Sequence, residues 1–194
     1  MKLRYLAAVV CFALTTFAAH AQIGVYLNPI AIHASDSVQD TGPFNFYDLN
    51  SKSRWLYGFN LGGYDDFFHS GALNAGLDVR LSDLHGGNAM LRSFMLGVRV
   101  SGQLKSRPIK PYVQASIGVG TTKAPQSTVH TSKGDFGVFG GADYSFAKHV
   151  DFRVFEVGYG SLTTISSATV GAGGNIAIPA AKLVTVSSGL VFRF

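Results

Sequence analysis

Cysteine is almost absent from this 194-residue chain, and charged residues are scarce. The single cysteine, Cys11, lies among the first 21 residues, so the rest of the chain can form no disulfide, thiolate metal site or cysteine nucleophile. Charged residues make up 14% and hydrophobic residues 47%, a balance opposite to that of disordered chains and unlike a coiled coil. The net charge of +5 is too small to indicate a nucleic-acid partner. The apolar residues therefore form either a large core or a surface that faces something other than water.

The first 21 residues have the pattern of a secretory signal peptide. Lys2 and Arg4 precede an almost wholly apolar stretch, and the segment ends in Ala19-His20-Ala21, a small-x-small cleavage pattern. The apolar stretch is shorter than the roughly 20 residues that a membrane-spanning helix needs. We therefore predict export, removal of residues 1–21 and a mature domain of residues 22–194.

Apolar residues in the mature chain alternate with polar or small ones, which is the pattern of β-strands with one apolar face. From Leu73 to Leu81, every odd position is apolar and every even position is polar, charged or glycine. We count eight such segments of about ten residues, the length that crosses a bilayer core when a strand is tilted. The segments are 23–32, 55–62, 73–81, 93–100, 113–119, 136–144, 150–160 and 184–194.

The connections between these segments alternate in length. The odd-numbered ones (34–54, 82–88, 121–134 and 162–180) are long or polar, and the even-numbered ones (65–69, 103–109 and 147–149) are mostly short. Transmembrane barrels have such short periplasmic turns and longer outside loops. We therefore predict an all-β, eight-stranded antiparallel up-and-down transmembrane barrel. Its first strand should pair with its last, because an unpaired backbone group in hydrocarbon costs several kcal/mol.

Alternation alone leaves two barrels open: a secreted lipocalin with an apolar interior, and an outer-membrane barrel with an apolar exterior. The polar face is rich in glycine and other small residues, which suit the narrow lumen of an eight-stranded barrel. Aromatic residues fall near strand ends, as the girdles at the two membrane interfaces require. Both observations favour the outer-membrane barrel. The predicted girdle residues are Trp55, Tyr57, Tyr64, Tyr144, Phe146, Tyr159 and Phe192.

The last eight residues are Ser187-Ser188-Gly189-Leu190-Val191-Phe192-Arg193-Phe194. They resemble the C-terminal assembly signal of bacterial outer-membrane barrels, with a polar Ser187, then Gly189, and hydrophobic Phe192 and Phe194 at alternate positions. Together with the leader and the strands, the chain resembles the small OmpA/OmpX-type outer-membrane barrels. The resemblance implies the bacterial outer membrane, contact with its lipid and lipopolysaccharide, escort by periplasmic chaperones and insertion by the barrel-assembly machinery. We expect a monomer.

Four charged residues, Asp78, Arg99, Asp143 and Glu156, are candidates for the lumen. A buried charge without a partner is very costly, so we expect a network of mutual pairs, with a proton or ion path as the alternative. The glycine clusters do not match a phosphate loop and the histidines lack metal-ligand spacing, so we predict no cofactor and no metal. We predict a structural or surface-exposed envelope role without a wide pore and without enzymatic activity.

Two other functions stay open. If the chain resembles a lipid A deacylase, it would use a His-x-Ser pair, here His33 and Ser35, with Asp36 or Asp40 as the carboxylate. A surface adhesin or ligand-binding barrel would act through its long loops. The cations expected in the loops are Arg54, Lys123, His130 and Lys133, which could meet lipopolysaccharide phosphates or a surface ligand.

Overall fold

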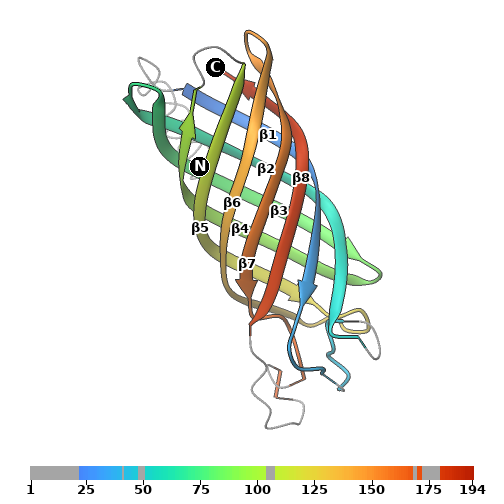
Figure 1. Ribbon diagram of the computed structural model, residues 1–194. Coiled ribbons are helices and arrows are strands. Elements are labelled where there is room, and N and C mark those ends of the chain that lie inside the picture. The colour runs from blue at the N-terminus through green and yellow to red at the C-terminus, as the bar shows by residue number, and fades with distance from the viewer. Residues whose placement is uncertain (1–21, 41, 48–50, 104–107, 168–169, 172–179) are drawn as a thin grey trace, which may run out of the picture.

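The computed structural model describes residues 22–40, 42–47, 51–103, 108–167, 170–171 and 180–194; the predicted leader, residues 1–21, lies outside them. Eight antiparallel strands pair in sequence order, and β1 also pairs with β8, which closes the sheet into a barrel (Figure 1). The predicted fold and closure are confirmed. Among the described residues, no helix is long and apolar enough to cross a membrane. The strands are β1 (Gln22–Ser35), β2 (Ser53–Ser70), β3 (Leu73–Gly86), β4 (Ala89–Gly102), β5 (Ile109–Lys123), β6 (His130–Ala147), β7 (Val150–Leu162) and β8 (Ala181–Arg193).

The alternating apolar residues point outward and form a continuous belt, which we call the apolar belt. On β3, Leu73, Leu77, Val79 and Leu81 are all exposed, whereas Asp78 and Arg80 between them are buried in the lumen. The same alternation runs through the other strands, so the barrel exposes apolar side chains to its surroundings. Only lipid suits such an exterior. The lipocalin alternative, with an apolar interior and a polar exterior, is therefore wrong.

The strands are longer than the predicted ten residues or so, ranging from 13 to 18. Antiparallel pairing continues past the apolar belt on the side of the long loops, where outward residues such as Asp83 and Arg92 face each other in register. Two connections predicted to be long are consequently short: residues 82–88 reduce to a turn at Gly87-Asn88, and residues 121–134 reduce to 124–129. Gly87 has φ +52°, a left-handed conformation that glycine adopts without strain.

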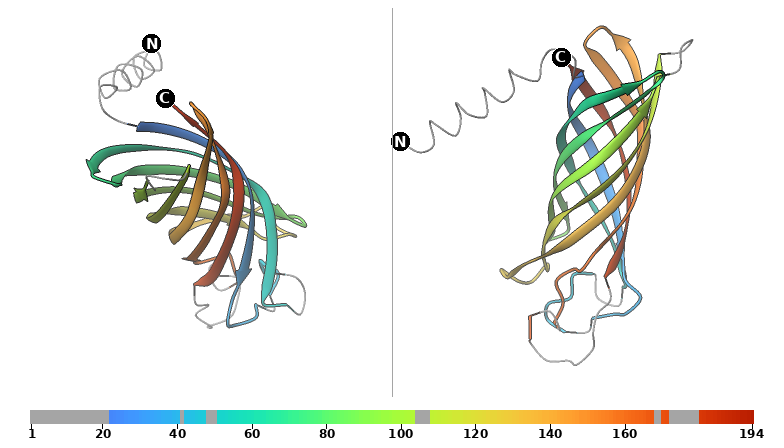
Figure 2. Two further views of the ribbon diagram at one scale, coloured as in Figure 1. Left: turned by 45° about the horizontal axis from the view of Figure 1, so that its top comes forward. Right: turned by 90° about the vertical axis from the view of Figure 1, so that its left-hand side faces the viewer.

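The two ends of the barrel differ. The start of β1 and the end of β8 lie together with the β2–β3, β4–β5 and β6–β7 connections, and the long β1–β2 and β7–β8 connections lie at the opposite end (Figures 1 and 2). In outer-membrane barrels the short turns are periplasmic and the long loops extracellular. By this rule the end with both strand termini is the periplasmic end, and the end with the long connections is the extracellular end.

One predicted girdle residue lies elsewhere. Tyr64 is buried in the lumen, where the guanidinium of Arg99 lies 3.7 Å from its ring centroid. Its even number places it on the same face of β2 as Gly62 and Asp66, and this alternation outweighs its position near a strand end. The other six girdle residues, by contrast, include exposed Trp55 and Tyr57, whose rings stack with centroids 6.3 Å apart.

The interior of the barrel has two layers. The extracellular layer is apolar: Phe46 and Tyr47 of the β1–β2 loop and Ile165 of the β7–β8 loop pack against lumen-facing leucines and isoleucines. We call this layer the apolar cap. The periplasmic layer is made of charged, uncharged polar and aromatic side chains. The lumen residues of the apolar cap include Ile30, Ile32, Leu56, Leu84, Leu91, Leu162 and Leu183.

Candidate functional site in the barrel lumen

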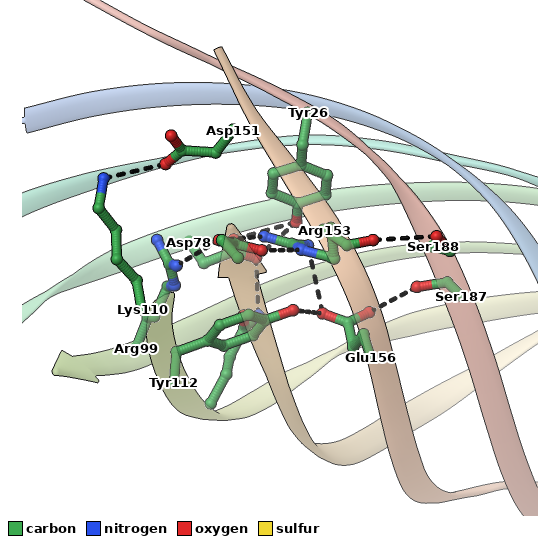
Figure 3. A network of polar contacts seen from close by, with 12 residues as sticks. Tyr26, Asp78, Arg99, Lys110, Tyr112, Asp151, Arg153, Glu156, Ser187 and Ser188 are labelled. Carbon is green, nitrogen blue, oxygen red and sulfur yellow. Dashed lines mark hydrogen bonds and ion pairs between the residues drawn. The ribbon is translucent and has the colours of Figure 1, made fainter. Parts of the chain in front are cut away.

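The periplasmic layer of the lumen contains five carboxylates and five cations joined by ion pairs, which we call the lumen network. Figure 3 shows part of it. Its members come from strands β2 to β8, and each side chain reaches the lumen because its position lies on the inward face of its strand. Opposite charges are equal in number, so the network carries no formal excess charge. The members are Asp66, Asp78, Asp143, Asp151, Glu156, Arg80, Arg99, Lys110, Arg153 and Arg193.

Glu156 is the centre of the lumen network. Its two oxygens accept from both terminal nitrogens of Arg80, each at 2.8 Å, which is a bidentate guanidinium–carboxylate pair. The Tyr112 hydroxyl donates to Oε2 at 2.7 Å, and Arg153 Nη1 lies 3.3 Å from the same oxygen. Ser187 Oγ donates to Oε1 at 3.1 Å. With four partners and no exposure to solvent, Glu156 links β3, β5, β7 and β8.

Asp143 and Arg153 form the second ion pair of the network. Arg153 Nε donates to Asp143 Oδ1 at 2.9 Å, and Arg99 Nη2 donates to Oδ2 at 3.0 Å. Both guanidinium groups also lie over the ring of Tyr112, with their central carbons 4.7 Å and 4.5 Å from its centroid. Cation–π contacts of this kind add to charge pairing and suit arginine's flat guanidinium group.

The other carboxylates complete the network toward its edges. Asp78 accepts from the Tyr26 hydroxyl at 3.0 Å and from Gln114 Nε2 at 2.6 Å. Asp151 is nearest the periplasmic end, where Lys110 Nζ lies at 3.0 Å and Arg193 Nε at 2.8 Å. At the edge on β2, Asp66 accepts from Ser101 at 3.2 Å and has Arg99 Nη1 4.0 Å away.

The four predicted lumen residues all lie in this network. Arg99 and Asp143 contact each other directly, whereas Asp78 and Glu156 are joined through Arg80, whose Nε lies 3.9 Å from Asp78. Sequence reasoning missed the remaining charged members. For Arg80 a signal was present, because it follows Asp78 by two residues on the same face of one strand.

Glycines lie on the neighbouring strand, in register with large lumen side chains that need room: Gly62 pairs with Tyr26 and Gly158 with Phe139. At Gly62 a Cβ atom would overlap the Tyr26 ring, and at Gly158 it would overlap the Phe139 ring. Arg80 in turn lies over the Phe139 ring, with its central carbon 4.1 Å from the centroid. The glycine-rich polar face predicted from the sequence thus makes space for a charged and aromatic interior.

The apolar cap is held in place by bonds between its two loops. Asp40 of the β1–β2 loop accepts from the backbone of Ser167 in the β7–β8 loop at 2.6 Å, and Phe44 N donates to Ser167 Oγ at 3.3 Å. Ile165 N donates to Thr122 Oγ1 at 2.8 Å, which ties the second loop to β5. Burial within the cap raises the pKa of the Tyr47 hydroxyl.

His33 and the two candidate carboxylates of the suggested His-x-Ser site each contact other residues. His33 packs against the Trp55 ring with centroids 4.9 Å apart. Asp40 accepts from the backbone of Gly42 and Ser167, and Asp36 accepts from the backbone of Val38. Neither carboxylate contacts His33 within the residues that the structure describes. The same part of the chain contains no group of three or more His, Cys, Asp or Glu placed to hold a metal ion.

The prediction that Arg54 is a loop cation is wrong. Arg54 faces inward at the extracellular end of β2, is buried, and donates to the backbone carbonyl of Gly86. Even-numbered residues of β2, such as Leu56, point into the lumen. Arg54 follows the same alternation, so it is a lumen residue and not a loop cation. Lys123 and His130 face each other in register at the ends of β5 and β6, and Lys133 is exposed on β6.

The C-terminal motif divides between the two faces of β8. Ser187 and Gly189 face the lumen, where Ser187 bonds to Glu156 and a Cβ at Gly189 would overlap the Asn28 side chain. Phe192 faces outward in register with Val25 and Val150. Phe194 is 78% exposed, and its backbone N–H donates to the Ile23 carbonyl at 3.0 Å.

No family model and no curated protein matches the chain. Solved structures do match it. Neisserial surface protein A is 14% identical, with a TM-score of 0.62 over 90% of this chain and 99% of that one. Ail, the attachment invasion locus protein of Yersinia pestis, is 12% identical in its complex with the heparin analogue sucrose octasulfate, with a TM-score of 0.52 over 90% of this chain and 99% of that one. At these identities the likeness is one of fold. The chain therefore has the fold of the small bacterial outer-membrane β-barrels, and its exposed apolar belt suits the lipid that surrounds such barrels.

Proposed function

We propose that this protein is an integral outer-membrane barrel with a structural or surface-exposed role in the envelope, without enzymatic activity and without a pore for ions or solutes. The observation that supports this most is the filled lumen. An ion crossing the barrel would have to displace the apolar cap and then separate charge pairs such as Arg80–Glu156, whose side chains are buried. Breaking a buried pair leaves uncompensated charge, which costs several kcal/mol.

The space between the two layers is small. A cavity of about 30 Å³, lined by Arg80, Asp135 and Phe139 among others, lies between the apolar cap and the lumen network. A volume of this size holds a water molecule but not a hydrated ion. It therefore does not provide a continuous path between the two ends of the barrel.

We predict that the purified barrel inserted into a planar bilayer will produce no large, steady conductance steps. The reason is that both layers of the lumen would have to open at once for a hydrated ion to pass. The measurement is single-channel recording at several voltages, with a wide porin in the same bilayer as the positive control. Reproducible steps from the wild-type barrel would contradict the closed-lumen role.

We further propose that Ser187, Gly189, Phe192 and Phe194 form the signal through which the barrel-assembly machinery inserts the chain. The exposure of the Phe194 side chain supports this, because a terminal ring that packs so little has no evident role in the folded barrel. The exposed end of β8 would be accessible to a partner during assembly.

We predict that Phe194→Ala will lower the amount of barrel assembled in cells while leaving the stability of the refolded protein within about 0.5 kcal/mol of the wild type. The substitution keeps the backbone hydrogen bond to Ile23 and removes only the exposed ring. Assembled barrel is measured as the heat-modifiable band of outer-membrane fractions on a gel. Phe146→Ala, which removes another exposed ring at the periplasmic end, is the matched control. Equal yields for Phe194→Ala and wild type would argue against the signal.

Surface binding through the extracellular end is the second candidate role. It is supported by a hollow at the β3–β4 and β5–β6 tips whose lining includes His85, Arg92, Lys123 and His130. A neighbour of the same fold, Ail, has been solved with a sulfated heparin analogue. Cell adhesion by variants that lack single extracellular loops would separate this role from a purely structural one.

A further inference from the structure

The outer face of β3–β6 changes from apolar to polar and charged over a single step of two residues along the strands. Leu81, Phe94 and Val119 are neighbours in register and are exposed, so they form the extracellular edge of the apolar belt here. Two residues further along each strand, again facing outward, the neighbours are Asp83, Arg92, Thr121 and Ser132. The following outward row contains His85, Lys123 and His130.

The apolar side of this boundary is hollowed. A shallow groove on the outside of the barrel is lined by Phe59, Leu61, Leu81, Phe94 and Val119, with Asp83, Arg92 and Thr121 at its extracellular edge. Gly134, the register partner of Val119 on β6, carries no side chain, and no atom lies within 4 Å of where its Cβ would be. The groove lies among exposed residues of the apolar belt, so its lining has a chemistry that suits an acyl chain.

The polar side of the boundary has an excess of positive charge. Asp83 accepts from Arg92 Nε at 3.1 Å and lies 3.1 Å from His85 Nε2, and all three side chains are more than half exposed. Because one carboxylate engages only one edge of the Arg92 guanidinium group, its other nitrogens stay free to donate to a second anion. Lys123 lies one outward position beyond Thr121, which is the register partner of Arg92. The hydroxyls of Thr121 and Ser132, 2.8 Å apart, add further donors.

We propose that this face, which we call the β3–β6 lipid site, binds a phosphorylated lipid of the outer leaflet, with an acyl chain in the groove and a phosphate between Arg92 and Lys123. The order of the rows supports a lipid over a soluble anion. Arg92 lines both the extracellular edge of the groove and the hollow at the β3–β4 and β5–β6 tips, so a phosphate that it binds lies beside the apolar groove. The extracellular edge of the apolar belt is different on β2, where the exposed rings of Trp55 and Tyr57 take the place of the charged residues.

The test compares the double variant Arg92→Gln/Lys123→Gln with the matched control Lys52→Gln/Lys182→Gln. The control removes two exposed extracellular charges outside the β3–β6 lipid site. Binding of hexa-acylated, bisphosphorylated lipid A to the folded barrel in micelles is measured by native mass spectrometry. Dephosphorylated lipid A, phosphatidylcholine, inorganic phosphate and a sulfated oligosaccharide are the comparison ligands. Heat-modifiable migration on a gel confirms that each variant is folded.

We expect lipid A to bind the wild type and the control with Kd values within about twofold of each other, because the control residues lie outside the site. The double variant should bind at least about tenfold more weakly, since each cation near a charged lipid surface contributes about 1 kcal/mol. Dephosphorylated lipid A should lose affinity for the wild type by a similar factor.

An unchanged affinity of the double variant would overturn the proposal, as would equal affinity for the dephosphorylated lipid. Binding of the sulfated oligosaccharide that depends on Arg92 and Lys123, without preference for lipid A, would overturn it in favour of a soluble ligand. None of these outcomes depends on whether the lumen conducts ions.

Discussion

Replacing Glu156 with alanine is expected to lower the free energy of unfolding of the barrel by about 3–5 kcal/mol, the usual cost of removing one partner of a buried ion pair. Glu156 is fully buried and accepts the two terminal nitrogens of Arg80 at 2.8 Å each. Without it, the Arg80 guanidinium retains the 3.5 Å contact with Gln114, the 3.9 Å approach to Asp78 and the face of the Phe139 ring, but no close carboxylate. Arg153, by contrast, keeps Asp143 as its partner. The cost therefore arises mainly from desolvated charge on Arg80.

The measurement is equilibrium unfolding by guanidinium chloride of the barrel in lipid vesicles, followed by the fluorescence of the single tryptophan, Trp55. Asp83→Ala is the matched control, because it also removes one carboxylate from an arginine pair, but from a pair that is more than half exposed. Exposed pairs contribute about 0–1 kcal/mol. If Glu156→Ala costs no more than Asp83→Ala, then the buried network does not stabilise the barrel.

A double variant tests whether the loss comes from the orphaned cation. In the Arg80→Met/Glu156→Leu variant both charges are removed, and apolar side chains of similar length take their place. Replacing a whole buried pair in this way is often neutral or stabilising. We expect the double variant to recover at least half of the stability lost in Glu156→Ala. A double variant that is less stable than Glu156→Ala would mean that the geometry of the pair, and not the orphaned charge, determines the cost.

The parity of residues along each strand predicts much of the fold and part of the lumen network. Because successive side chains in a strand alternate between faces, the sequence positions of Asp78, Arg99, Asp143 and Glu156 are enough to indicate that they face the lumen. Tyr64 follows the same rule, since its even number places it in the lumen although it lies near a strand end. The partners of each charge are not predictable in this way, because parity gives a face but not a height or a direction across the lumen.

The position of Arg153 in the lumen could not be predicted together with that of Glu156 from the alternation of faces along a strand. It precedes Glu156 by three residues, so strict alternation would place the two on opposite faces of β7. The structure places both in the lumen, because the β7–β8 register shifts between Arg153 and Glu156. A β-bulge of this kind adds a residue to one strand and changes the face of everything beyond it. Nothing in the local sequence marks that position as a bulge.

The apolar cap could not be predicted for a different reason. Phe46, Tyr47 and Ile165 lie in long connections with no periodicity, and they enter the lumen because lumen-facing residues near the extracellular end are apolar. One of those lumen residues, Leu56, lies on the face of β2 that the alternation predicts to be polar or small. Its burial needs apolar partners from outside the strands, and the two loops supply them.

Val79→Lys is expected to lower the free energy of unfolding of the barrel in lipid by about 2–4 kcal/mol, the cost of a lysine on the lipid face near the bilayer midplane. Val79 points outward, is 40% exposed, and lies within the apolar belt with Leu77 and Leu81 on either side along β3. Its cross-strand neighbours are Gly63 and Leu96, so no carboxylate stands in register to pair with the new cation.

Gln103→Lys adds the same charge in the β4–β5 connection, beyond the belt, and should cost at most about 1 kcal/mol. Both variants are measured by the same unfolding assay in vesicles. The two substitutions differ only in whether the cation meets hydrocarbon or water, so equal costs would mean that the exposed apolar belt does not face lipid.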